Sequence, residues 1–146
     1  MSLGADQRYM RRAIALAQAR LGRTGENPAV GCVIVRNGEV IAEAATADDG
    51  RPHAEEQALA AAGDRAGGAT AFVTMEPCGE RSNGAASCSE RLAAAGVARV
   101  VFASDNPHAL SAGRGPARLR DAGVALEPGF LREEAAFLYT DGSPPP

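Results

Sequence analysis

Apolar side chains along this chain follow two spacings, one typical of helices and one typical of buried strands. Near the N-terminus they recur every three or four positions, which predicts a helix from about residue 6 to residue 22. Continuous apolar runs over 29–35, 69–75 and 97–103 instead predict buried strands. Asn37-Gly38 separates the first run from a second apolar stretch, 40–45, and this dipeptide is typical of a β-hairpin turn.

The rest of the chain alternates helical patterns with strands. Helices are predicted to begin at Pro52 and at Ser87-Cys88-Ser89-Glu90, which has the form of a capping box. Later patterns predict two helices and one short strand, over 116–122, 131–139 and 124–127. We therefore expect an α/β fold, a three-layer α/β/α sandwich whose mixed five-stranded sheet has one antiparallel hairpin and otherwise largely parallel strands. Residues 1–140 form the predicted domain, and 141–146, ending in three prolines, a flexible tail or the start of a linker.

Composition narrows the function classes. The 146 residues carry a net charge of −3, and all 15 basic residues are Arg, which argues against a broad nucleic-acid surface. No apolar run has the length of a membrane span, and the N-terminus lacks the pattern of a signal peptide, so we expect a cytoplasmic protein. Three Cys are an odd number, which disfavours a disulfide framework. Cys32 lies inside an apolar run and is interpreted as a small buried hydrophobe.

Four residues have the chemistry of a catalytic zinc site. His53 and Cys88 are each expected in the first turn of a helix, and Cys78 at the end of a strand. Three such ligands leave one position open for water, and Glu55 lies two residues after His53, about 200° around the helix, where it would neighbour that open position. A single His or Cys is more often structural, but the order His-x-Glu, Pro-Cys, Cys favours zinc. Glu56 is expected at the solvated surface, and Glu76 in a structural hydrogen bond.

These motifs resemble those of the zinc-dependent cytidine-deaminase-like superfamily, and within it the pyrimidine deaminase domain of the bifunctional riboflavin-biosynthesis deaminase/reductase. The narrower likeness rests on the stretches 25–35, 52–59, 68–78, 95–101, 112–115 and 119–123. The resemblance as a whole covers nearly the whole chain, from about residue 8 to residue 139. The resemblance implies a cytidine-deaminase-like fold and the hydrolytic deamination of an amino-pyrimidine, in this branch a diaminopyrimidinone ribosylamino phosphate.

The resemblance also implies roles for individual residues. Zn²⁺ would be held by His53, Cys78 and Cys88, and Glu55 would carry protons between water and the departing ammonia. Asn27 corresponds to a substrate-contacting Asn of the family, and a homo-oligomer is typical of the superfamily. Three further side chains are candidate substrate contacts. Arg51 and Arg81 are candidates because Arg binds phosphate well, and His108 because it follows a strand end. Each can also be interpreted as an ordinary loop residue.

The sequence departs from the riboflavin pattern at its substrate side. The insert between the paired Cys, 79–87, is one residue longer and lacks both His; Ala44-Ala45-Thr46 replaces a Gly-aromatic-His, and 106–109 departs from Asp-Pro-Asn-Pro. Two alternatives therefore stay open: a deaminase of another free base, nucleoside or amino-heterocycle, and a non-catalytic domain with structural zinc. A fourth protein ligand would favour the second alternative.

Overall fold

A computed structural model of the chain describes residues 3–79, 86–106 and 113–140. Five strands and five α-helices alternate along it, with short 3₁₀ turns at Asp48–Gly50, Gly63–Ala66 and Ala136–Tyr139. The helices are α1 (Leu3–Gln18), α2 (Ala54–Ala62), α3 (Cys88–Ala94), α4 (Arg114–Asp121) and α5 (Arg132–Ala135). The strands are β1 (Gly31–Arg36), β2 (Glu39–Ala45), β3 (Thr70–Met75), β4 (Arg99–Ser104) and β5 (Ala125–Glu127).

The strands form one mixed sheet in the order β2-β1-β3-β4-β5. β3, β4 and β5 run parallel to one another, whereas β1 is antiparallel to both of its neighbours. The predicted hairpin between β1 and β2 is confirmed, and its turn residues Asn37 and Gly38 have φ of 52° and 78°, the left-handed values that a tight hairpin turn requires. The expected five-stranded sheet is also confirmed.

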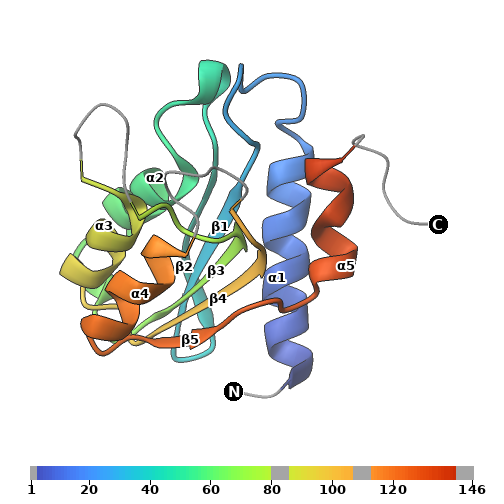
Figure 1. Ribbon diagram of the computed structural model, residues 1–146. Helices are drawn as coiled ribbons and strands as arrows, with labels where there is room; N and C mark the ends of the chain where they lie inside the picture. The colour runs from blue at the N-terminus through green and yellow to red at the C-terminus, as the bar shows by residue number, and fades with distance from the viewer. Residues whose placement is uncertain (1–2, 80–85, 107–112, 141–146) are drawn as a thin grey trace.

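Helices cover both faces of the sheet, as a three-layer sandwich requires, with α1 and α5 on one side and α2, α3 and α4 on the other (Figure 1). The layer under α1 is built on Met10, Val33 and Phe72, which are all fully buried. The layer under α2–α4 is built on Ile34 and Leu92, also fully buried. β1 has buried residues on both faces, which explains why its sequence is a continuous apolar run rather than an alternating one.

α1 lies unusually close to the sheet, and one glycine permits this. A Cβ atom on Gly31 would lie 1.9 Å from the carbonyl oxygen of Ala13, so only Gly fits at the start of β1. Arg99 of β4 ties the other end of α1 down, since its Nη2 donates to Asp6 at 2.7 Å and to Glu127 at 2.8 Å. The helix on this face is therefore fixed at two points.

Several predicted element boundaries were wrong by a few residues. α1 begins at Leu3 and ends at Gln18, short of Gly22. The last predicted helix begins one residue late, after Leu131 with its left-handed φ of 55°, and it is divided into α5 and a 3₁₀ turn from Ala136 to Tyr139. Residues 141–146, predicted to be a tail or linker, lie outside the described residues. Within the described residues, no helix is both long and apolar enough to cross a membrane.

Candidate metal centre

Three potential metal ligands meet at the carboxyl end of β3. His53 lies directly before α2, Cys78 in the segment that follows β3, and Cys88 at the first position of α3. One ligand atom from each lies within 4.8 Å of the others, and these three form the one such group found among the described residues. The sequence assigned these same residues to the metal, and the fold brings them together from three separate elements.

The distances between the ligand atoms suit a tetrahedral ion. Nδ1 of His53 lies 3.4 Å from Sγ of Cys88. Tetrahedral zinc with bonds of about 2.0 Å to nitrogen and 2.3 Å to sulfur would separate two such atoms by about 3.6 Å. Because no carboxylate among the described residues joins the group, it offers three protein ligands, the number found in catalytic rather than structural zinc sites.

Cys78 is electrostatically prepared to bind a cation. Its sulfur accepts a hydrogen bond from the backbone N–H of Cys88 at 3.1 Å. The pKa of Cys78 is lowered to about 4, chiefly by a hydrogen bond with the Cys88 side chain, and His53 adds to the effect. A thiolate is the form that binds metal. By contrast, burial raises the pKa of Cys32 well above its usual value, in keeping with the predicted hydrophobic role.

Glu55 is a buried carboxyl group beside this cluster. Only 4% of the residue is exposed, and burial is the main reason that its pKa rises to about 7. Cys78 raises this pKa further, whereas His53 and a hydrogen bond with Cys88 oppose the rise. A carboxyl group whose pKa lies near neutrality can both take up and release a proton under ordinary conditions.

The loop that carries Cys78 is held by its backbone. The carbonyl oxygen of Cys78 accepts from Ser89 N–H at 3.1 Å, and that of Gly79 accepts from Arg118 Nε at 2.7 Å. Two glycines let α4 approach this loop. A Cβ on Gly115 would lie 1.9 Å from the Pro77 carbonyl oxygen, and a Cβ on Gly79 would lie 2.3 Å from the Cβ of Arg114, the first residue of α4. α4 therefore fixes the position of Cys78.

Hydrogen bonds hold Glu76, two residues before Cys78, and Ser87, directly before Cys88. Oε2 of Glu76 accepts from the Gly113 N–H at 3.0 Å, which confirms its predicted structural hydrogen bond. The predicted capping box at the start of α3 is also confirmed: Ser87 Oγ accepts from Glu90 N–H at 3.2 Å, and Glu90 Oε1 lies 3.5 Å from Ser87 N. The cap fixes the helix whose first residue is Cys88.

Two predictions about the start of α2 were wrong. His53 is not in the first turn but is the N-cap residue, with extended backbone angles, and Pro52 lies outside the helix. Glu56 is not a solvated surface residue: its side chain is 18% exposed, Oε1 lies 3.5 Å from His53 N–H, and Oε2 lies 3.7 Å from Arg91. Glu56 thus belongs to the cap of α2, a role that the third residue of a helix often has.

Comparison with known proteins places this geometry in a family. Residues 3–104 match the model of the cytidine and deoxycytidylate deaminase zinc-binding region. The chain belongs to that deaminase family. It is 47% identical over 133 residues to the riboflavin biosynthesis protein RibD of Escherichia coli, a match that covers 91% of this chain and 36% of that protein.

Solved structures agree with the assignment of this chain to the deaminase family. Acinetobacter baumannii RibD superposes with a TM-score of 0.88 at 44% identity, over 94% of this chain and 38% of the other. A Thermotoga maritima protein described as a diaminohydroxyphosphoribosylaminopyrimidine deaminase/5-amino-6-(5-phosphoribosylamino)uracil reductase superposes with a TM-score of 0.85 at 36% identity, over 92% and 39%. The chain therefore spans little more than a third of the length of these relatives. The expected cytidine-deaminase-like fold is confirmed.

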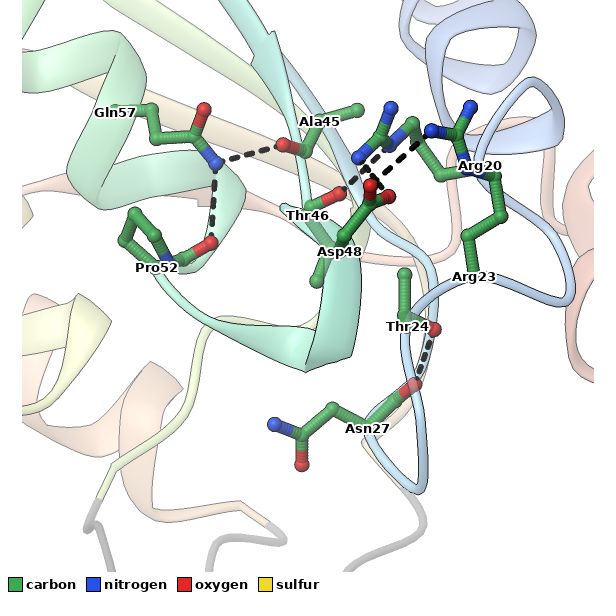
Figure 2. Close-up of polar contacts among 9 residues, drawn as sticks. All are labelled: Arg20, Arg23, Thr24, Asn27, Ala45, Thr46, Asp48, Pro52 and Gln57. Carbon is green, nitrogen blue, oxygen red and sulfur yellow. Dashed lines mark hydrogen bonds and ion pairs between the residues drawn. The ribbon is translucent and has the colours of Figure 1, made fainter.

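Two of the four candidate substrate contacts, Asn27 and Arg51, lie within the described residues, on two adjoining loops. Nδ2 of Asn27 donates to the Gly50 carbonyl at 3.0 Å, which joins the loop before β1 to the loop before α2. Figure 2 shows the Asn27 side chain pointing away from Arg20 and Arg23. Arg51 is exposed and makes no hydrogen bond or ion pair within the described residues. Arg81 and His108 lie outside those residues.

Thr46, which replaces a His of the riboflavin pattern, has a structural role. Only 2% of it is exposed, and its Oγ1 accepts from Val30 N–H at 2.9 Å. Its backbone N–H donates in return to the Val30 carbonyl at 2.9 Å. The Thr46 hydroxyl therefore faces the backbone at the start of β1 and closes the end of the hairpin.

Sequence reasoning missed two residues that support the site. Gln57 donates to carbonyl groups on both sides of the 46–52 loop, at Ala45 and Pro52. Tyr139 reaches the end of the sheet, where its hydroxyl donates to the Ala29 carbonyl at 2.8 Å and lies 2.7 Å from Thr74 Oγ1. Neither role follows from periodicity, because each depends on tertiary contacts between distant segments. For Tyr139, the sequence shows only an aromatic residue at the end of the last apolar stretch.

Proposed function

We propose that this chain is a zinc-dependent deaminase of an amino-pyrimidine, with the diaminopyrimidinone ribosylamino phosphate of riboflavin biosynthesis as its substrate. The observation that carries the proposal is the three-ligand cluster of His53, Cys78 and Cys88 with the buried carboxyl group of Glu55 beside it. The substrate is supported by the likeness to the Escherichia coli riboflavin protein and to the Thermotoga maritima deaminase/reductase.

The cluster fits zinc by ligand type and spacing, since thiolate and imidazole are ligands that zinc prefers. When bound at such a site, zinc supplies Lewis acidity that makes water a competent nucleophile near neutral pH. The remaining chemistry is proton transfer, which we assign to Glu55. Its carboxylate takes a proton from the attacking water and returns one to the amino group, which leaves as ammonia while the ring carbon gains an oxygen.

The position of Glu55 suits this assignment. Burial has raised its pKa to about 7, so the protonated and ionised forms are close in free energy and each step of the transfer is feasible. Because the group lies at the second position of α2, two residues after the proposed metal ligand His53, the same helix start orients both. A structural zinc site would need a fourth protein ligand, and none joins the group within the described residues.

The test measures metal content and ammonia release in the same sample. Purified protein should carry close to one zinc per chain and release ammonia from the pyrimidine intermediate. Glu55→Gln should keep the zinc and lose at least about 100-fold in rate, the usual scale of a lost general acid–base group. Glu39→Gln, the same change at an exposed position of β2, is the matched control.

A panel of pyrimidine, purine and pterin amines separates the alternatives, and the loss of the family's His at Thr46 is the reason to include it. Consumption of another amino-heterocycle in place of the riboflavin intermediate would refute the substrate and keep the reaction. No ammonia from any compound in a zinc-loaded sample would refute the enzyme. A homo-oligomer and a cytoplasmic location stay predictions, the first to be checked by light scattering.

A further inference from the structure

The side-chain amide of Gln57 is shared between two segments that flank the 46–52 loop. Its Nε2 lies 2.7 Å from the Ala45 carbonyl oxygen, at the end of β2, and 3.0 Å from the Pro52 carbonyl oxygen (Figure 2). Both neighbours are acceptors, so the NH₂ group must face them, and the His53 carbonyl oxygen lies 3.5 Å from the same nitrogen. The amide therefore closes the base of the loop from the side of α2.

The same residue also holds the peptide groups on either side of His53. Nε2 of Gln57 donates to the carbonyl that precedes His53, and its backbone N–H donates to the carbonyl of His53 itself at 3.2 Å. The two peptide planes that flank the Cα of His53 are thus fixed by one residue, four positions further along the chain. Together they set the direction of the His53 side chain, whose Nδ1 faces Cys88 at 3.4 Å.

The loop has few other anchors on this side. Pro52 has no backbone N–H, and within the described residues its carbonyl accepts one further hydrogen bond, from Ala47 N–H at 3.2 Å. The other side-chain and backbone contacts of the loop run to the segment before β1, among them Asp49 N–H to the Arg23 carbonyl at 2.9 Å, Asn27 to Gly50, and Arg20 and Arg23 to the Asp48 carboxylate (Figure 2). Gln57 is therefore the side chain that connects the loop to the helix that follows it.

We propose that Gln57 is a positioning residue for the metal ligand His53. The inference rests on the metal centre proposed above. Without the amide, the peptide before His53 keeps only its contacts with Ala47 N–H and Glu56, and the imidazole spends less time at the distance that the ion requires. Groups that orient a metal ligand typically change metal affinity by about 10–100-fold when they are removed.

The experiment compares Gln57→Met with Gln18→Met, the same change at an exposed position at the end of α1. Met matches Gln in length and helix propensity but donates no hydrogen bond. Zinc affinity is measured by competition with a chromophoric chelator, and the cobalt(II)-loaded absorption spectrum reports the ligand geometry. Urea unfolding in EDTA measures the stability of each metal-free protein. Gln57→Asn, which keeps the amide on a shorter arm, is the second variant if Gln57→Met does not fold.

Gln57→Met should bind zinc about 10–100-fold more weakly than the parent and shift the cobalt spectrum, whereas Gln18→Met should match the parent within about twofold. Equal zinc affinity in Gln57→Met and the parent would overturn the inference and leave the metal centre intact. A lower metal-free stability with unchanged affinity and spectrum would also overturn it, because Gln57 would then be merely structural. A parent protein that binds no zinc would overturn both the metal centre and this inference.

Discussion

Glu55→Gln should make the metal-free protein more stable at neutral pH, even though it removes the proposed proton carrier. The pKa of Glu55 rises from 4.5 to about 7 in the folded chain, chiefly because the carboxyl group is buried. The folded state therefore keeps its proton over a range in which the unfolded state has lost it. Stability then falls as pH rises from about 4.5 to about 7, because the unfolded state binds fewer protons in that range.

The magnitude follows from the width of that range. A difference of about 2.5 pH units at about 1.4 kcal/mol per unit gives a loss of about 3.5 kcal/mol, complete above pH 7. Gln resembles the protonated acid in shape and does not ionise, so Glu55→Gln avoids this loss. The variant should match the parent below pH 4.5 and exceed its free energy of unfolding by about 3.5 kcal/mol above pH 7.

Urea unfolding of both proteins in EDTA and a reductant, at several pH values between these limits, provides the assay. Cys78 titrates in both proteins, so its contribution largely cancels in the difference between the two curves. Glu39→Gln controls for the substitution itself at an exposed position. A difference curve that stays flat with pH would refute the reasoning, since it would show that folding does not raise the pKa of Glu55.

Two further substitutions test the supports of the site. Tyr139→Phe should lower the free energy of unfolding in urea by about 1–3 kcal/mol, because it leaves the buried Ala29 carbonyl without its donor. The control is Tyr9→Phe: the Tyr9 hydroxyl donates to the exposed Gly38 carbonyl, so its loss should cost under about 0.5 kcal/mol. Equal costs in the two variants would contradict the structural role of Tyr139. Gly115→Ala should weaken zinc binding in a chelator competition, because its Cβ would lie 1.9 Å from the Pro77 oxygen and displace the Cys78 loop, whereas Gly67→Ala, whose Cβ meets only ordinary contacts, should bind as the parent does.

The sequence contained enough to predict the sheet and to single out His53, Cys78 and Cys88, which the fold brings together. Buried strands such as β1 and β3 are apolar runs with clear ends, and Asn37-Gly38 specifies its own turn. The capping box at Ser87 was equally readable, because it is a local pattern of four residues. Features of this kind depend on residues a few positions apart, so they can be predicted without knowledge of the tertiary structure.

The prediction failed where tertiary contacts decide the outcome. Pro52 suits the first turn of a helix, but the Gln57 amide and the Ala47 N–H hold its carbonyl outside the helix, so α2 begins after His53. Glu56 looked like an exposed charge because nothing in the sequence indicates that it caps the helix and approaches Arg91. The close approach of Gly115 to Pro77 is likewise invisible in sequence, since it joins residues nearly forty positions apart.

Within the described residues, both cysteines are held by contacts at the edges of the insert between them or outside it. Cys78 is fixed from outside that segment, by Ser89 N–H and by α4 packing against Pro77. Cys88 is fixed by the Ser87 cap, which is local to α3. The printed supports lie at Gly79, Ser87 and Ser89 and in α4, so we expect substitutions at these supports to disturb the cluster of His53, Cys78 and Cys88. The departure of the 79–87 insert from the riboflavin pattern leaves the Ser87 cap intact, which is consistent with an unchanged ligand set beside an altered insert.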